Sequence, residues 1–565
     1  MKKIKIKING QEVVCPSEDN IWQAAKGAGI IIPGLCGHPD FTHKANCRIC
    51  VVEVKGCDKL ITSCSTKVSA GMEIITDSDR IKKARNLNIE LLFAEHIEKC
   101  ATCIWRVNCK LLDLADKYKI HITAFKDRKG DRRTYKFANA VEIDGTQCID
   151  CRNCIDACSK MQKIDYLEIK GKGIDQEIVP IKNKNKDCIY CGQCAVHCPV
   201  GSAQEQSGWD MVEKVIKNKK SFINFSGRII VAQLSPVVGV SLAEEFGLEC
   251  GQDTTGQIIT GLRELGFDYV YNASINNDIA SLLEVKELLN NIKKRYAKPL
   301  LTASCPAWVK YVEFYYPKFA ANLSKVKSPQ IIGGLAIKNY LAKKLNINSK
   351  NIVVVTIAPC TAQKYEASRK DLKVKNQWPV DYVITTRELA WLFKKNKIDF
   401  PKLKESQADK LINNAGGVNI IYEATGGISV AAINAIAYLS RSKKNAILTE
   451  EIKNLTGLSG FKSANIKIAG KNVKVGVVNG IGNIDDILRD LGNYDYIEVR
   501  ACPAGCVGGG GQPITTTPLS RKIRTLSLHK ISKKNRINKF KNTKEILNWL
   551  KKQDAIDEQE FYIKK

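Results

Sequence analysis

Residues 501–513 read Ala-Cys-Pro-Ala-Gly-Cys-Val-Gly-Gly-Gly-Gly-Gln-Pro and combine two cysteines with a run of four glycines. Two shorter motifs also contain a cysteine, Thr-Ala-Ser-Cys-Pro at 302–306 and Ala-Pro-Cys at 358–360. The segments before 358 and before 501 are apolar and β-branched, as buried strands are. Soft thiolates brought together from several strand ends are what an iron–sulfur centre needs. The sequence therefore predicts one such centre, with four ligands: Cys305, Cys360, Cys502 and Cys506.

Around these motifs, from about residue 209, apolar runs alternate with helical stretches such as Gly256–Leu265 and Asp278–Lys294. This alternation predicts an α/β domain with parallel sheets. The expected strands are Arg228–Leu234, Phe267–Tyr271, Asn351–Ile357, Val380–Thr385, Val473–Val478 and Tyr494–Val499.

The N-terminal part begins with two alternating segments, Lys3–Ile8 and Glu12–Cys15, which predict a hairpin around Asn9-Gly10. Four cysteines follow with a tight central pair, a spacing that suits a [2Fe–2S] cluster and resembles plant-type ferredoxin-like domains. Zinc is the alternative, although the long first spacer fits a zinc ribbon poorly. The four are Cys36, Cys47, Cys50 and Cys64.

A second group combines one imidazole with three thiols: His96, Cys100, Cys103 and Cys109. It follows a helical stretch at Asp77–Ala94. By spacing alone this group could bind zinc. Its position resembles that of the [4Fe–4S] site with one histidine and three cysteine ligands in complex I and in some hydrogenases, which favours a cluster.

An internal repeat of the bacterial ferredoxin run gives the strongest local signal. The first run is Cys148, Cys151, Cys154 and Cys158, and the second is Cys188, Cys191, Cys194 and Cys198. In two-cluster ferredoxins the fourth cysteine of each run binds the other cluster. Cys158 is therefore expected with the second run and Cys198 with the first.

The composition limits the compartment and the partners. Disulfides could explain 22 cysteines, but they need an oxidising compartment, and the N-terminus reads as a strand, not as an export signal. No run approaches the roughly 18 apolar residues of a membrane span. A cytoplasmic, reduced, metal-rich protein is expected. The formal net charge of +30 suggests an acidic electron-carrier protein as partner, and the alternative is a lysine-rich solvated surface. No nucleic-acid module is visible.

Together these motifs resemble the iron-only ([FeFe]) hydrogenases over nearly the whole chain. The resemblance implies multidomain α+β iron–sulfur modules followed by a large α/β catalytic domain with parallel sheets. The expected parts are a [2Fe–2S] domain at 1–78, a histidine-ligated [4Fe–4S] domain at 79–138, a two-cluster ferredoxin domain at 139–208, the catalytic domain at 209–520 and a basic extension at 521–565.

The resemblance also implies the cofactor, the reaction and the partners. The cofactor of that family, the H-cluster, is a [4Fe–4S] unit joined through one cysteine to a di-iron unit with CO, cyanide and a bridging amine-dithiolate. The resemblance implies that this cysteine is Cys506 here. Three further [4Fe–4S] clusters and one [2Fe–2S] cluster would exchange electrons with the H-cluster while it interconverts protons and H₂. The implied partners are ferredoxin, maturation proteins and, for an NADH-linked enzyme, flavoprotein subunits.

Further positions follow from the same resemblance. Ser235, Pro236 and Gln330 would line the cofactor. Glu284, Glu287 and Ser324 fall where the family has its proton route, although two glutamates three residues apart are more often a solvated helix face.

Four positions depart from the family pattern. Ser304 replaces a proton-carrying cysteine and Gln363 a lysine, whereas Ala358 and Arg500 replace methionines. Glu366 matches the family's acidic position. Lys364 could substitute for the missing lysine, and Arg500 could restore its charge. All four H-cluster ligands remain, so a bound cluster with altered turnover is expected.

Two other functions stay open at this point. One is a sensory or slow hydrogenase, against which the absence of a fused kinase-like or PAS-like segment argues. The other is a non-catalytic iron–sulfur scaffold, against which the complete glycine motif argues. The sequence contains no flavin or nicotinamide fingerprint.

Overall fold

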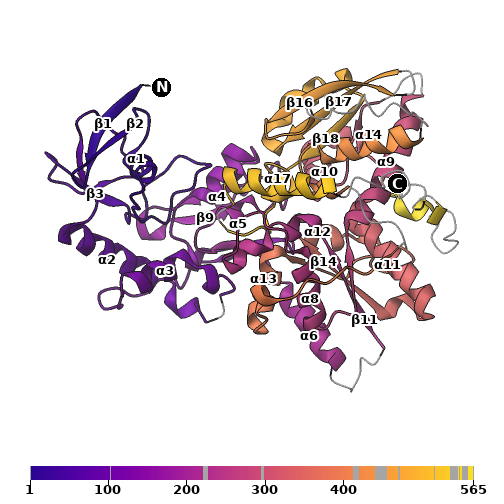
Figure 1. Cartoon of the computed structure of the whole chain (residues 1–565), viewed down its shortest axis with the longest axis horizontal. Coiled ribbons are helices and arrows are strands. Elements are labelled where there is room, and N and C mark those ends of the chain that lie inside the picture. Colours follow the sequence, from indigo (N-terminus) through magenta and orange to yellow (C-terminus); the bar gives the residue numbers. More distant parts are fainter. Residues whose placement is uncertain are drawn as a thin grey trace.

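A computed structural model gives the fold of the chain, with the iron–sulfur modules at one end and the catalytic domain at the other (Figure 1). Among the described residues, no helix combines the length and apolarity that crossing a membrane requires. The structure describes residues 2–101, 103–220, 227–293, 298–411, 419–439, 455–468, 471–514, 516–534, 545, 548–549 and 558–563.

The N-terminal module is a five-stranded sheet in the order β2-β1-β5-β3-β4. The predicted hairpin is confirmed, because β1 and β2 pair antiparallel on either side of Asn9, whose φ is +50°. The elements are β1 (Lys3–Ile8), β2 (Gln11–Pro16), α1 (Ile21–Gly27), β3 (Val51–Val54), β4 (Ile61–Thr62) and β5 (Glu73–Ile75). Helices α2 (Asp79–Ala94) and α3 (Lys110–Lys117) follow, and the Ser78 side chain caps α2.

The ferredoxin-like module has two small sheets and two very short helices, so its cysteines lie mainly on loops. The first sheet is β10-β7-β6 and the second is the hairpin β8-β9. Their bounds are β6 (Thr134–Phe137), β7 (Val141–Asp144), β8 (Leu167–Lys170), β9 (Glu177–Pro180) and β10 (Ala203–Glu205), with α4 (Asn153–Asp156) and α5 (Gln193–Val196).

The catalytic domain has an all-parallel sheet in the order β12-β11-β14-β15. Its strands are β11 (Ile229–Leu234), β12 (Tyr269–Asn272), β14 (Ile352–Ala358) and β15 (Tyr382–Thr385). Side chains of β11 alternate between two cores: Val231 faces one with helices α9 (Ser274–Ile292) and α11 (Pro329–Leu345). Ile230 and Ala232 face the other, which contains α6 (Trp209–Lys220), α8 (Thr255–Leu265) and α13 (Thr386–Lys395). The predicted parallel sheet is confirmed.

A second sheet has the order β13-β18-β17-β16 and is parallel except for its edge hairpin, where β16 and β17 run antiparallel. Its strands are β13 (Leu300–Leu301), β16 (Phe461–Ile468), β17 (Lys471–Asn479) and β18 (Tyr496–Arg500). The remaining α-helices are α7 (Pro236–Gly239), α10 (Pro306–Tyr315), α12 (Ala362–Ala367), α14 (Gly427–Leu439), α16 (Asp485–Arg489) and α17 (Pro518–Lys534).

Helix α17 crosses from the catalytic domain toward the iron–sulfur modules (Figure 1). Arg521 of α17 pairs with the buried Asp40 of the N-terminal module, with a shortest distance of 2.6 Å. The start of the expected basic extension at 521–565 is thus packed into the fold. Most of that extension beyond residue 534 lies outside the described residues.

Candidate functional site

The carboxyl ends of strands from both sheets meet at one internal cavity. Cys305 lies between β13 and α10, Cys360 follows β14, Cys502 follows β18, and Cys506 begins the short helix η14 (Cys506–Gly508). All four cysteines line this cavity. The carboxyl edge of parallel strands is the usual place for a ligand in such domains. The structure therefore brings together the four cysteines that the sequence singled out.

The four thiols are close enough to influence one another. Burial, and then the neighbouring Cys506 and Cys305 thiols, raise the pKa of Cys360. Burial and then Cys360 raise the pKa of Cys502 in the same way. Thiols whose pKa is raised in this way need cations nearby to become thiolates, and metal ions supply that charge.

The other groups around the cavity fit a polar occupant. Six buried polar atoms on its wall have no hydrogen-bond partner among the described residues, and they belong to Asn277, Ser304, Ser328, Gln330, Tyr422 and Arg500. A buried polar atom without a partner costs free energy. An inorganic group with hydrogen-bonding ligands would satisfy several of these atoms at once, so the residues fit an H-cluster.

The glycine run is required by packing within the protein. A Cβ at Gly508 would lie 2.2 Å from the Pro503 carbonyl oxygen, and one at Gly509 would lie 2.3 Å from that of Pro359. Because glycine has no side chain, it lets the backbone approach a ligand closely. The contacts show that they also let the 501–513 segment pack against the other cysteine motifs.

Upstream, the cysteines of the two ferredoxin runs influence one another electrostatically. Burial raises the pKa of Cys188, followed by the charges of Cys191, Cys194 and Cys158. Burial does the same for Cys151, and the next largest cause is the charge of Cys198 of the other run. The thiols of each set therefore lie near one another across the two runs.

The two N-terminal groups of ligands are also assembled. The Sγ atoms of Cys50 and Cys64 are 3.3 Å apart, and a hydrogen bond with the Cys36 thiol lowers the pKa of Cys47. In the second group, His96 Nε2 is buried without a partner, as a ligand atom would be. Burial, Lys129 and Lys99 lower the pKa of His96 to about 4, which keeps the imidazole neutral.

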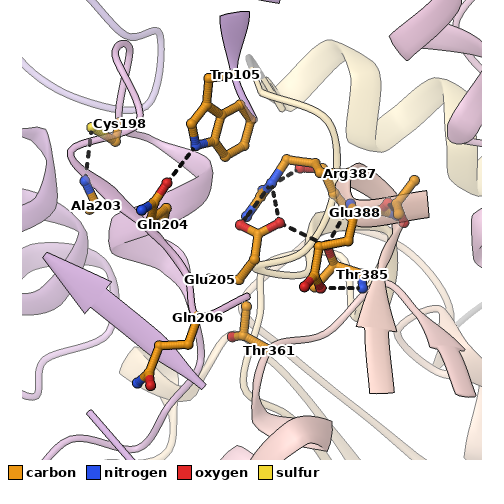
Figure 2. A network of polar contacts seen from close by, with 12 residues as sticks. Trp105, Cys198, Ala203, Gln204, Glu205, Gln206, Thr361, Thr385, Arg387 and Glu388 are labelled. Atoms are coloured by element: carbon orange, nitrogen blue, oxygen red, sulfur yellow. Dashed lines mark hydrogen bonds and ion pairs between the residues drawn. The ribbon is translucent and has the colours of Figure 1, made fainter. Parts of the chain in front are cut away.

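A buried polar network joins the ferredoxin-like module to the catalytic domain (Figure 2). Arg387 of α13 forms an ion pair with Glu205, and its guanidinium lies 4.6 Å from the ring centre of Trp105. Trp105 Nε1 donates to Gln204 at 3.1 Å. Since Trp105 belongs to the segment with Cys103 and Cys109, this network links that segment, the ferredoxin-like module and the catalytic domain.

Comparisons with known proteins agree with this geometry. Residues 228–510 match the family "Iron only hydrogenase large subunit, C-terminal domain". The chain is 33% identical over 531 residues to the NADP-reducing hydrogenase subunit HndD of Solidesulfovibrio fructosivorans, covering 91% of this chain and 89% of that protein. The chain belongs to the iron-only ([FeFe]) hydrogenase family.

Other members of the [FeFe]-hydrogenase family also match. Iron hydrogenase 1 of Clostridium pasteurianum is 34% identical, over 90% of this chain and 88% of its own length. A structure of HydA1 from Chlamydomonas reinhardtii superimposes with a TM-score of 0.53 at 26% identity, and covers 62% of this chain and 97% of its own. Upstream, residues 1–79 match a 2Fe-2S iron-sulfur cluster binding domain, 85–123 the NADH-ubiquinone oxidoreductase-G iron-sulfur binding region and 147–202 a 4Fe-4S dicluster domain.

The residues expected from the hydrogenase pattern do not all reach the cavity. Five of them line it: Ser235, Ser304, Gln330, Gln363 and Arg500. Pro236, Ala358 and Glu366 are buried but do not line it. Glu366 lies behind Gln330, which donates to it at 2.5 Å. Burial raises the pKa of Glu366 to about 7.

The structure excludes Lys364 as a substitute for the missing hydrogenase lysine. Its Nζ lies 2.7 Å from Glu388 and donates to the Gln206 carbonyl oxygen at 2.6 Å. Both partners belong to the network of Figure 2, outside the cavity. The lysine side chain points there because Glu388 is fully buried and needs a cation.

Two cavity residues, Tyr422 and Glu423, were missed by the sequence analysis. They lie on the short helix η11 (Ile420–Glu423), directly before the Ala424–Gly427 segment that resembles the hydrogenase pattern. Glu423 accepts a hydrogen bond from Ser235, and burial raises its pKa. Their only sequence signal was this adjacency.

The three residues of the expected proton route form two contacts. Ser324 donates to Glu287 at 2.7 Å. Tyr496 donates to Glu284 at 3.1 Å. Burial, and then the charge of Glu287, raise the pKa of Glu284 to about 8, so this carboxyl holds a proton at neutral pH.

Proposed function

We propose that this chain is an active [FeFe]-hydrogenase that catalyses 2 H⁺ + 2 e⁻ ⇌ H₂ at an H-cluster. Its ligands would be Cys305, Cys360, Cys502 and Cys506, with Cys506 bridging to the di-iron unit. The observation that supports this most is that four cysteines, three of them buried, and six buried polar atoms without a hydrogen-bond partner surround one cavity. When bound, the cluster supplies the redox chemistry.

The other cysteines would hold the electron-transfer clusters. We assign one [2Fe–2S] cluster to residues 1–78, one histidine-ligated [4Fe–4S] cluster to 79–138 and two [4Fe–4S] clusters to 139–208. The catalytic domain would span 209–520. The electrostatic influence of Cys191 on Cys502 supports a direct approach of the last ferredoxin cluster to the cavity.

Protons would reach the cavity through the side chains that the chain places between it and the surface. The Ser304 hydroxyl can accept a proton at Oγ while it donates its own. Glu284, with its raised pKa, can hold a proton and release it. Glu287 and Ser324 would continue this path toward solvent, since Glu287 is only partly buried.

The electron carrier that we propose is an acidic ferredoxin-like protein, since the chain is strongly basic. The relative HndD is named as a subunit of an NADP-reducing hydrogenase, which supports flavoprotein subunits as a second route. A ferredoxin partner predicts rates that fall as salt is added. Salt-independent rates, together with activity that needs added NAD(P)-linked subunits, would favour the second route.

The deciding experiment uses the full chain produced with hydrogenase maturation proteins. H₂ evolution with reduced ferredoxin, H₂ uptake and infrared spectra are measured on the same preparation. We expect CO and cyanide bands and turnover in both directions. Bands with very slow turnover would indicate a sensory enzyme, and no bands after maturation would indicate a non-catalytic scaffold.

A further inference from the structure

Arg500 places a guanidinium inside the cavity. It is the last residue of β18, is 3% exposed and lies six residues before Cys506. Its Nη1 is 4.0 Å from the Cys506 Sγ, and its Nη2 donates to the Tyr422 carbonyl oxygen. Its Nε has no hydrogen-bond partner. The side chain is thus fixed by the Tyr422 backbone and directed at a thiol.

No carboxylate fully balances this charge. Glu498 is the nearest acid, with Oε1 3.6 Å from Arg500 Nε. Its two carboxyl oxygens instead accept hydrogen bonds from the Gly426 and Ser429 backbone and from the Ser429 hydroxyl. Burial raises the pKa of Glu498, which weakens it as a counter-ion.

The other acids near the cavity are no better partners. Burial raises the pKa of Glu423, whose carboxyl already accepts a hydrogen bond from Ser235, and raises that of Glu284 to about 8. A guanidinium stays protonated at any ordinary pH. The one acid paired with this buried cation, Glu498, shares its oxygens with other donors, so the arrangement favours a further anion in the cavity. Thiolates of a bound cluster are such anions.

The rest of the cavity wall is neutral or acidic. Among the described residues that line it, Arg500 is the one cation. Gln363 is uncharged, and the adjacent Lys364 is held outside by Glu388. The positive charge next to the four cysteines therefore comes from the side of Cys506 alone.

We propose that Arg500 is a positioning residue that acts through Cys506 and raises the reduction potential of the cluster bound there. A fixed positive charge beside the ligand stabilises the form with one more electron. The step is a one-electron reduction in which no bond of the protein forms or breaks. This inference rests on the proposed function, because it requires an H-cluster on Cys506.

The test is a redox titration of the maturated full chain with soluble mediators as the electron source. The CO and cyanide infrared bands monitor the oxidation state of the cluster during the titration. Arg500→Gln keeps a donor for the Tyr422 carbonyl but removes the charge. Arg500→Met is a second neutral variant, with an apolar side chain of similar length. It provides the same comparison if the Gln variant does not fold. Arg500→Lys keeps the charge.

We expect both neutral variants to lower the equilibrium constant for reduction at least tenfold, which is about 59 mV toward negative potential for one electron. Arg500→Lys should retain most of the wild-type potential. Arg489→Gln, which removes an exposed charge, is the control that should change nothing. Equal midpoints in wild type and in the neutral variants would overturn the inference, as would a lysine variant that behaves like the methionine one. Missing bands in the wild type would instead overturn the proposed function.

Discussion

The ferredoxin-like module and the catalytic cavity both gather cysteines, but in different ways. In the module, eight cysteines lie in two short runs, and the crossed grouping brings Cys158 and Cys198 to the opposite runs. In the cavity, the four cysteines come from three segments separated by tens of residues, and two sheets must form before they meet. The first kind of site depends on local spacing and the second on the whole domain.

The difference also extends to the surroundings of the ligands. Around the module, the structure shows mainly backbone donors, such as Ala203 N to Cys198 Sγ at 3.4 Å. Around the cavity, side chains from distant elements face the site, among them Ser304, Tyr422 and Arg500. An assembled site can therefore change its chemistry by single substitutions while its ligands stay the same.

Removing a ligand from each region should separate the two kinds of site most strongly. We expect Cys506→Ser to abolish both the CO and cyanide bands and H₂ turnover, because the proposed bridging ligand would be lost. Cys198→Ser should leave those bands in place and remove or convert one [4Fe–4S] signal in electron paramagnetic resonance. A Cys198 variant without the infrared bands would show that the two regions assemble as one unit.

The contact between the two regions is the next target. Arg387 and Glu205 are both almost fully buried, so Arg387→Gln leaves an unpaired buried carboxylate and should cost about 3–5 kcal/mol of stability. The measurement is the denaturant midpoint of the loaded chain. Arg369→Gln breaks a more exposed pair with Glu313 and should cost about 1 kcal/mol or less. Equal losses would mean that the interface contributes no more than the surface.

How much of the structure could be predicted from the sequence depends on the same difference between local spacing and assembly from distant segments. The hairpin at Asn9, the crossed ferredoxin runs and the parallel strands of the catalytic domain were readable, because local spacing and periodicity encode them. The direction of a side chain is set by packing from distant segments. Spacing therefore left Lys364 undecided, and it gave no sign that Tyr422 and Glu423 reach the cavity.

The proposed proton path would extend the cavity through a second set of distant residues. Glu284→Gln cannot exchange a carboxyl proton, so H₂ evolution should fall about 100-fold while the infrared bands remain. The wild-type Glu284 is protonated below its pKa of about 8, so turnover should decline as the pH rises through that value. The hydrogen bond from Tyr496 lowers this pKa, so Tyr496→Phe should move the decline to higher pH. An unchanged rate profile in both variants would place the path elsewhere.

The smallest expected effect concerns one atom of the cavity wall. Ser304 Oγ is buried without a partner, and as a hydroxyl it passes a proton only by accepting and donating together. A thiol, which ionises near pH 8.5, can release its proton first. Ser304→Cys should therefore raise H₂ evolution, by about tenfold at most, since a carrier pKa near the working pH favours transfer.

Ser328→Cys is the matched control, because Ser328 also lines the cavity with an unpartnered hydroxyl but lies beside Glu366. A rise in neither variant would mean that Ser304 already passes protons faster than the rest of the reaction, and a rise in both would mean that any thiol in the cavity suffices.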